Sequence, residues 1–278
     1  MLLLFLLVCL LLHSCTSFRP NPLMTWDEYV RQPRNEPYVL ELNSYGGSLV
    51  YYGAFHKVDP SHPQFEDIEQ KWEEFQPTFA FCEGSSWPIE ETYDKAIEKY
   101  GEQGFVTFLA ARDGIPVECI DPTLTDQIKY LKNYYPHHLI KVYYVLRQAA
   151  INRMLKKDTA ASVYAKPYFR KINHIHGHHH APSNLKDFER MVTHLFPELD
   201  EWQKIPYSYF QCPESGGFLT AIHRKLNGYR DRIMIKKVTK AMKKGKRVFA
   251  IVGRSHVVIQ EAALRSLLDP SLTSSPSN

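Results

Sequence analysis

The chain has 278 residues, of which 44% are hydrophobic and 23% charged, values typical of a globular protein and not of a disordered or fibrous one. Its 34 basic and 30 acidic residues give a formal charge of +4 and are mixed along the sequence, except for a basic run at residues 236–247. That run contains no aromatic residue and accompanies no nucleic-acid-binding motif. We interpret it as a solvated helix face and predict no nucleic-acid partner.

The first 17 residues, MLLLFLLVCLLLHSCTS, contain no Lys, Arg, Asp or Glu and are apolar as far as Leu12. This run is too short to span a bilayer, which takes roughly 20 apolar residues, and small polar residues follow it. We therefore expect an export signal that is cleaved near Ser17. Residues 12–15, LHSC, also resemble an imperfect bacterial lipobox, which leaves membrane attachment through Cys15 as an alternative. The sequence predicts a protein that is secreted, periplasmic or membrane-anchored.

After the leader, hydrophobic runs alternate with helical patterns. Strands are predicted at 47–52, 78–82 and 115–120, and helices at 64–75 and 89–111, the second broken near Gly101 and Gly104. Alternation with short turns predicts parallel pairing of the strands. Three cysteines follow the leader, an odd number, and two of them lie in strand-like runs. We expect structural thiols and no disulfide framework.

Between about residues 123 and 226 the pattern changes to aromatic-rich helical stretches with Pro-containing breaks, and we predict an inserted helical segment that forms a lid. A helical run over 230–244, a strand at 247–252 and a last helix at 257–268 follow. The tail, 269–278, is predicted to be disordered. The expected fold is one α/β domain over 18–268, with a mostly parallel central sheet flanked by helices.

Two GxxH motifs follow predicted strands. Gly53 and His56 come at the end of the first strand, and Gly253 and His256 at the end of the last one. The motif alone is weak, since a third copy stands at 177–180. Its position is the stronger signal, because open α/β sheets bind ligands at the carboxyl ends of their strands. A glycine there lets the backbone turn sharply or pack closely, so that the imidazole faces the crevice.

Carboxylates occupy the same place after the other two strands. Glu83 follows the second strand and Asp121 follows the third. We therefore expect two imidazoles and two carboxylates to converge at one edge of the sheet. An isolated residue of this kind is more often a hydrogen-bonded turn residue, whereas four of them together indicate a site.

These motifs resemble the superfamily that joins TraB, the Tiki proteases, the erythromycin esterases and the haem-binding lipoprotein ChaN. The resemblance rests on the early GxxH, Glu83 after the next strand, the late GxxH, and the segment YRDRIM at 229–234. In that segment Arg230 looks like the family's arginine, which opens the helix before the last strand. The likeness covers about 45–121 and 226–268, and the middle hundred residues match nothing.

The resemblance implies a site residue by residue. His56 would be the water-activating base or a metal ligand, Glu83 its carboxylate partner, His256 the second histidine and Arg230 the positive group. A neighbouring carboxylate would raise the pKa of His56 or fix its tautomer. A base with a pKa near 7 and a donor for the developing oxyanion suit the hydrolysis of an ester or peptide bond.

Further residues complete the expected site. Asp121 joins the catalytic group because of its position after a strand. Arg254 is an alternative oxyanion donor to Arg230, and Gly53 and Gly253 belong to the same substrate and oxyanion region. His56, Glu83 and His256 could hold Mn, Co or Zn; the Tiki branch is described as requiring a divalent cation and the esterase branch as working without one.

Three functions are consistent with the resemblance. The first is an exported hydrolase, and the presence of Glu83 and Arg230 favours it. The second is a haem- or metal-binding surface protein of the ChaN type without hydrolytic activity. The segment NHIHGHHH at 173–180 favours binding, since such runs bind transition metals or haem, although a polar loop is the simpler interpretation. The third is a scaffold that has lost activity and acts only through partners.

Overall fold

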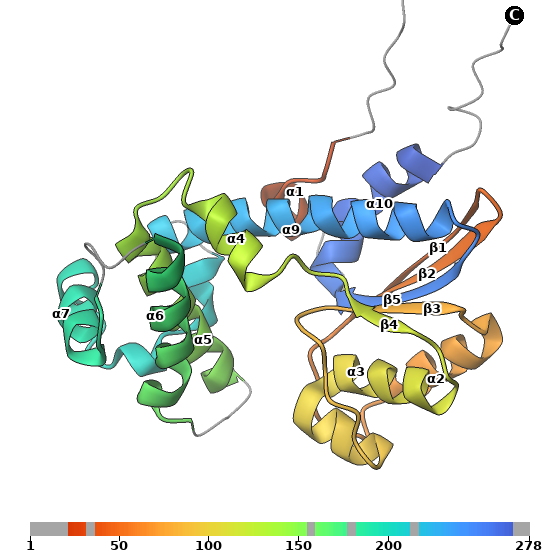
Figure 1. Ribbon diagram of the computed structural model, residues 1–278, viewed down its shortest axis with the longest axis horizontal. Helices are drawn as coiled ribbons and strands as arrows, with labels where there is room; N and C mark the ends of the chain where they lie inside the picture. The colour runs from red at the N-terminus through yellow and green to blue at the C-terminus, as the bar shows by residue number, and fades with distance from the viewer. Residues whose placement is uncertain (1–21, 32–36, 155–158, 177–181, 212–216, 269–278) are drawn as a thin grey trace, which may run out of the picture.

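The computed structural model describes residues 22–31, 37–154, 159–176, 182–211 and 217–268 (Figure 1). The predicted leader with Cys15, residues 177–180 of the histidine-rich segment, Cys212 and the predicted tail lie outside these residues. None of the described helices combines the length and the hydropathy that a membrane span requires.

The core of the fold is a five-stranded sheet in the order β1 (Tyr38–Ser44), β2 (Gly47–Ala54), β5 (Arg247–Gly253), β3 (Phe79–Cys82) and β4 (Val117–Cys119). All neighbours pair in parallel except β1 and β2. The predicted α/β class with a mostly parallel sheet is confirmed. β1 was not predicted. It forms a hairpin with β2 through Tyr45 and Gly46, both at positive φ (52° and 72°), as a tight two-residue turn requires.

Helices cover both faces of the sheet (Figure 1). α2 (Gln64–Phe75) and α3 (Tyr93–Arg112) pack on one face, and α9 (Phe218–Met242) and α10 (Arg254–Leu268) on the other. Successive residues of β2 alternate between these layers, with Leu49 and Tyr51 facing α9 and α10 and Val50 and Tyr52 facing α2 and α3. This burial on both faces explains the nearly continuous apolar strand sequences.

The region predicted as an insertion is helical and has its own core. It contains α4 (Leu124–Leu131), α5 (His137–Met154), α6 (Ala161–His176), α7 (Leu185–Leu195) and two short 3₁₀ helices, η1 (Trp202–Lys204) and η2 (Tyr207–Phe210). Aromatic side chains such as Tyr143, Phe188 and Phe210 fill the space between these helices. Many aromatic residues of this region are therefore packing residues.

One helix joins the two parts of the molecule. The first turns of α9 pack into the helical region through Leu219, Ile222 and Leu226, and its later turns pack on the sheet through Met234 and Val238. The expectation that a helix begins near residue 230 is wrong. Apolar residues continue the helix back to Phe218, so the boundary expected at 226 lies inside α9 and Arg230 lies in the middle of the helix.

Two other boundaries bear on the site. α3 begins at Tyr93 and not at 89, because Thr92 caps it by accepting a hydrogen bond from the Lys95 N–H. α10 begins at Arg254, directly after β5, and not at 257. His256 therefore lies in the first turn of a helix. The short helix α1 (Trp26–Arg31) lies beside α10, where the Met24 N–H donates to the Ile259 carbonyl.

Candidate functional site

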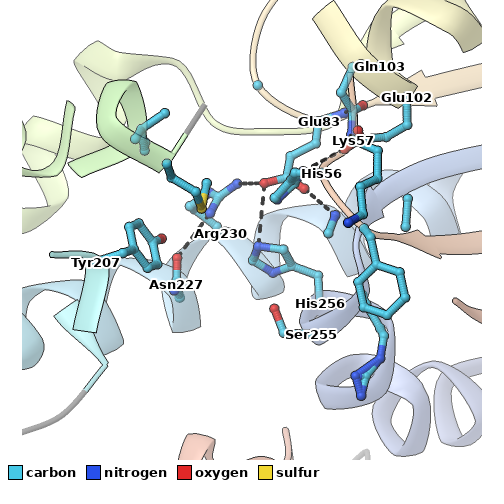
Figure 2. A pocket seen from close by; sticks show the side chains of 18 of the residues that line it. His56, Lys57, Glu83, Glu102, Gln103, Tyr207, Asn227, Arg230, Ser255 and His256 are labelled. Atoms are coloured by element: carbon cyan, nitrogen blue, oxygen red, sulfur yellow. Dashed lines mark hydrogen bonds and ion pairs between the residues drawn. The ribbon is translucent and has the colours of Figure 1, made fainter. Parts of the chain in front are cut away.

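The carboxyl ends of three adjacent strands form the site. β5 lies between β2 and β3, with Ala54 beside Gly253 and Cys82 beside Ile251. His56 follows β2, Glu83 follows β3 and His256 follows β5, so parallel pairing brings the two ends of the domain together. Arg230 reaches the same place from α9 (Figure 2). The structure thus brings together the four side chains that the motifs indicate.

A cavity of about 670 Å³ opens at this edge, between the sheet and the helical region. Six residues of the predicted site line it, namely His56, Glu83, Arg230, Gly253, Arg254 and His256. Side chains that the sequence did not single out complete the wall, including Trp87, Glu102, Arg147, Tyr207 and Asn227. Its size is within the range of small-molecule sites.

Glu83 is the centre of the polar network. Its Oε1 accepts a hydrogen bond from Nη2 of Arg230 at 2.6 Å and lies 3.7 Å from Nε2 of His256, while its Oε2 accepts from the Gly253 N–H at 2.5 Å (Figure 2). Burial raises the pKa of this carboxyl, but the positive charges of Arg230, His256 and His56 outweigh burial and hold the pKa well below its usual range. Glu83 is therefore ionised across the physiological pH range.

Arg230 is buried between two carboxylates. Besides Glu83, its Nε and Nη2 donate to Asp121 at 2.7 and 2.9 Å, and its Nη1 donates to Asn227 at 3.0 Å. Asp121 also accepts from the Gly84 N–H at 2.9 Å. Asp121 is 5% exposed and is not among the residues that line the cavity. The expectation that Asp121 is catalytic is thus corrected, because this carboxylate holds Arg230 from behind.

His56 has a different carboxylate partner from the one that the family pattern implies. Its Nδ1 lies 2.6 Å from Oε1 of Glu102, a residue of α3 that is 2% exposed. The negative charge of Glu102 is the main cause that raises the pKa of His56 to about 9, and Glu83 adds to it. The expectation that Glu83 is the direct carboxylate partner of His56 is therefore wrong, because Glu102 holds that place. Glu83 still acts on the imidazole through its negative charge.

A kink in α3 places Glu102. Gly101 has φ 62° and ψ −146°, a conformation open only to glycine, and a Cβ there would lie 2.8 Å from the Lys57 carbonyl oxygen. The kink turns the next two residues toward the strand ends, where Gln103 accepts a hydrogen bond from the Glu83 N–H at 2.7 Å. The sequence signal was the predicted helix break near Gly101, which did not by itself identify Glu102 as a site residue.

His256 is held in the same way as His56. Its Nδ1 lies 2.6 Å from Oδ1 of Asp231, which also accepts from Gln260 at 2.7 Å. Burial is the largest influence on His256 and lowers its pKa, but the negative charges of Asp231 and Glu83 together with the hydrogen bond to Asp231 outweigh it, so the pKa is raised overall. Both imidazoles therefore have Nδ1 fixed by a buried carboxylate, with Nε2 on the side of Glu83. Asp231 directly follows Arg230 in the YRDRIM segment but was not identified from the sequence.

The glycines of the motifs serve close packing. A Cβ on Gly253 would lie 3.3 Å from His56 Nε2 and 3.4 Å from Glu83 Oε2, so a larger residue there would crowd both groups at the strand end. Gly53 packs against the Arg254 backbone and does not line the cavity. The Gly253 N–H already donates to Glu83, so neither glycine fits the expected role in an oxyanion site.

Arg254 also lies in the cavity wall. Its guanidinium stacks near the rings of Tyr29 and Phe55, and its Nη1 donates to the Tyr29 hydroxyl at 3.3 Å. Its Nε and Nη2 are buried without a hydrogen-bond partner. Arg254 thus lies in the cavity wall beside two aromatic rings, and its role as an alternative oxyanion donor stays a prediction.

A divalent cation fits the donor set poorly. One oxygen of Glu83 accepts from a guanidinium and the other from a backbone N–H, and the positive charge of Arg230 would repel a metal at the remaining positions. Within the described ranges, no three His, Cys, Asp or Glu side chains are grouped so that they could hold a metal ion. The two imidazole Nε2 atoms are the donors that such an ion would have.

A scan against protein-family models finds no match, and searches of curated proteins and of solved structures find no significant match either. The resemblance to the TraB and Tiki superfamily therefore rests on the motifs themselves. Function is inferred from the geometry of the site.

Proposed function

We propose that this chain is an exported hydrolase that cleaves an ester or peptide bond by attack of water, with His56 as the base. The observation that carries the proposal is the arrangement of His56, whose Nδ1 is fixed by Glu102 while its ring lines a cavity of about 670 Å³. A buried carboxylate on one nitrogen selects the tautomer that leaves the other nitrogen able to accept a proton. The His56 side chain is 52% exposed, so water and substrate have access to it.

In the proposed reaction, Nε2 of His56 accepts a proton from water as the water oxygen attacks the carbonyl carbon. The carbonyl oxygen becomes negative and needs a donor. His256 suits this role, because its raised pKa favours the protonated form, in which Nε2 donates. When the tetrahedral intermediate collapses, His56 returns its proton to the leaving alkoxide or amine.

Arg230 and Glu83 have a supporting role in this mechanism. Arg230 fixes Glu83 through one hydrogen bond of 2.6 Å, and Glu83 keeps a negative charge beside both imidazoles. That charge stabilises each imidazolium, the form of His56 after it has accepted the proton. A metal ion is not required by this scheme, in keeping with the poor fit of the donor set, and turnover that survives a chelator such as EDTA would support it.

The test is a screen of the full chain against p-nitrophenyl esters and fluorogenic peptides, with and without Mn²⁺, Co²⁺ or Zn²⁺. His56→Gln should lower turnover by about 10²-fold or more, the usual contribution of a positioned base, while circular dichroism stays that of the parent. His174→Gln, at an exposed residue of α6, is the matched control. Turnover by His56→Gln equal to that of the parent would refute the assignment.

The ChaN-like alternative remains a prediction. No described contact favours haem binding, and residues 177–180 of the histidine-rich segment lie outside the described residues. A visible spectrum of the full chain with added haem tests it, since a Soret band that depends on residues 174–180, without hydrolysis, would support binding instead. Export is equally a proposal, and the mass of the mature protein would show whether the first 17 residues are removed or Cys15 is lipidated.

A further inference from the structure

Arg147 is a cation in the cavity wall with no anionic partner. It belongs to α5 of the helical region and lines the same cavity as His56 and Glu83. Its Nε is buried without a hydrogen-bond partner, and among the described residues no carboxylate pairs with its guanidinium. By contrast, Arg230 in the same cavity contacts both Glu83 and Asp121. A buried charge without a partner is costly in free energy, because it has lost the water that solvated it. An anion that binds the guanidinium lowers this cost.

Arg147 shares its cavity with the proposed catalytic groups. Arg147 lines the cavity together with His56 and His223, and its positive charge acts to lower the pKa of both imidazoles. Tyr143, one turn earlier on α5, has its hydroxyl hydrogen-bonded to His223, and the Tyr168 hydroxyl donates to Gln148. The guanidinium is therefore available to a group that enters the cavity.

The same face of α5 continues as an apolar surface. Ile151 and Met154 follow Arg147 at intervals of four and three residues, which places all three on one side of the helix, and all three line the cavity. Met154 is 50% exposed, an unusual environment for a large apolar side chain. Two further apolar side chains, Trp87 and Val30 of α1, line the same cavity.

We infer that Arg147 binds an anionic group of the substrate, a carboxylate or a phosphate, and that the apolar body of the same substrate lies along Ile151 and Met154. The inference rests on the proposed function, since it names the substrate class of that site: an ester or amide that carries a negative charge on an apolar body. Arg147 is a specificity residue in this scheme. His56 and His256 carry out the proton transfers at the scissile carbonyl.

The experiment measures binding separately from turnover. Three probes share one apolar body: 4-phenylbutyrate, 4-phenylbutyl phosphate and the neutral 4-phenylbutyramide. Calorimetric titration of the full chain at constant ionic strength should show at least one anion binding about 10- to 100-fold more tightly than the amide, as a charge-assisted contact predicts. The tighter of the two anions identifies the group.

Arg147→Gln should remove this preference, and Arg147→Lys, which keeps the charge without the planar fork, should retain part of it. Arg170→Gln, at an exposed residue of α6, is the matched control and should bind like the parent. If neither anion binds more tightly than the amide, or if Arg147→Gln leaves the preference intact, the inference is wrong.

Hydrolysis of p-nitrophenyl esters is measured on the same samples. Turnover of neutral esters without any preference for anions would uphold the proposed function and overturn the role of Arg147. Anion binding through Arg147 with no turnover of any ester or peptide would overturn the proposed function. The anion would then be a ligand of the cavity and not a substrate. The affinity measurement thus tests the role of Arg147, and the rate measurement tests the hydrolytic function.

Discussion

Glu102→Gln tests the central contact of the site. Glu102 is the largest cause of the raised pKa of His56, which lies at about 9. Without the carboxylate we expect that pKa to fall to about 6.5 or lower, the ordinary range of histidine. Such a fall corresponds to roughly 300-fold weaker proton binding. The remaining charges that act on the ring are Glu83 and Arg147, and the substitution leaves both in place.

The sign of the effect on activity depends on the role of the base. Only neutral His56 accepts a proton, so hydrolysis by the parent should rise with pH through about 9. In Glu102→Gln the midpoint of this rise should move toward 6.5, and the plateau should fall because the tautomer is less well fixed. Folding stability should change with pH in the opposite direction to activity. Protonated His56 favours the folded state, so its contribution to stability is complete below about pH 6.5 and is lost as the pH rises through about 9.

An NMR titration of the His56 ring proton in the full chain gives the pKa directly, and the pH profile of ester hydrolysis gives the kinetic midpoint. Glu118→Gln, at an exposed carboxylate of β4, is the matched control and should leave both values unchanged. An unchanged His56 pKa in Glu102→Gln would refute the reasoning. So would a larger fall in Glu83→Gln than in Glu102→Gln.

Three further predictions concern the scaffold of the site. Arg230→Met leaves Glu83 and Asp121 without their cation, and the free energy of unfolding in urea should fall by about 3–5 kcal/mol. Adding Asp121→Asn should recover part of this loss. An unchanged midpoint of urea unfolding in Arg230→Met would contradict a stabilising role for these ion pairs. Gly101→Ala forces a Cβ to within 2.8 Å of the Lys57 carbonyl at positive φ and should cost about 1–3 kcal/mol, more than Gly114→Ala, where φ is also positive but the space is open. Because the pKa of Glu83 is held well below its usual range, its contribution to stability should be complete above about pH 4.3 and be lost only as the pH falls far below that value. The melting temperature of Glu83→Gln should therefore depend less on pH in acid than the melting temperature of the parent.

The sequence predicts the elements that have a local signature. Four of the five strands were predicted, and the apolar runs of β2, β3 and β5 reflect burial on both faces of the sheet. The helix α2 has the expected bounds, 64–75. His56, Glu83 and His256 were identifiable because each lies within three residues of the end of a strand. Knowing where strands end was enough to expect these side chains at one edge of the sheet.

Other parts of the site have no local signature. Glu102 lies 46 residues from His56 in the sequence, and only the kink at Gly101 brings it to the imidazole. Arg147 is one of many cations in a helical region that carries no recognisable motif. Arg230 was expected at the start of a helix, yet it acts from the middle of α9 because the apolar positions that begin this helix pack on the helical region and not on the sheet. Each of these contacts depends on tertiary packing, which a pattern within one segment does not encode.

The two GxxH motifs are alike in sequence but differ in environment, and the cause is the type of element that comes after each strand. A loop comes after β2, so the His56 side chain is 52% exposed, whereas α10 begins directly after β5 and leaves the His256 side chain 8% exposed. An exposed imidazole can exchange protons with water and with a leaving group, while a buried one whose partner Asp231 is also held by Gln260 is a fixed donor. In the proposed mechanism the two histidines are therefore not interchangeable: the motif supplies the same side chain twice, and the next element of the chain decides which of them moves protons and which stabilises charge.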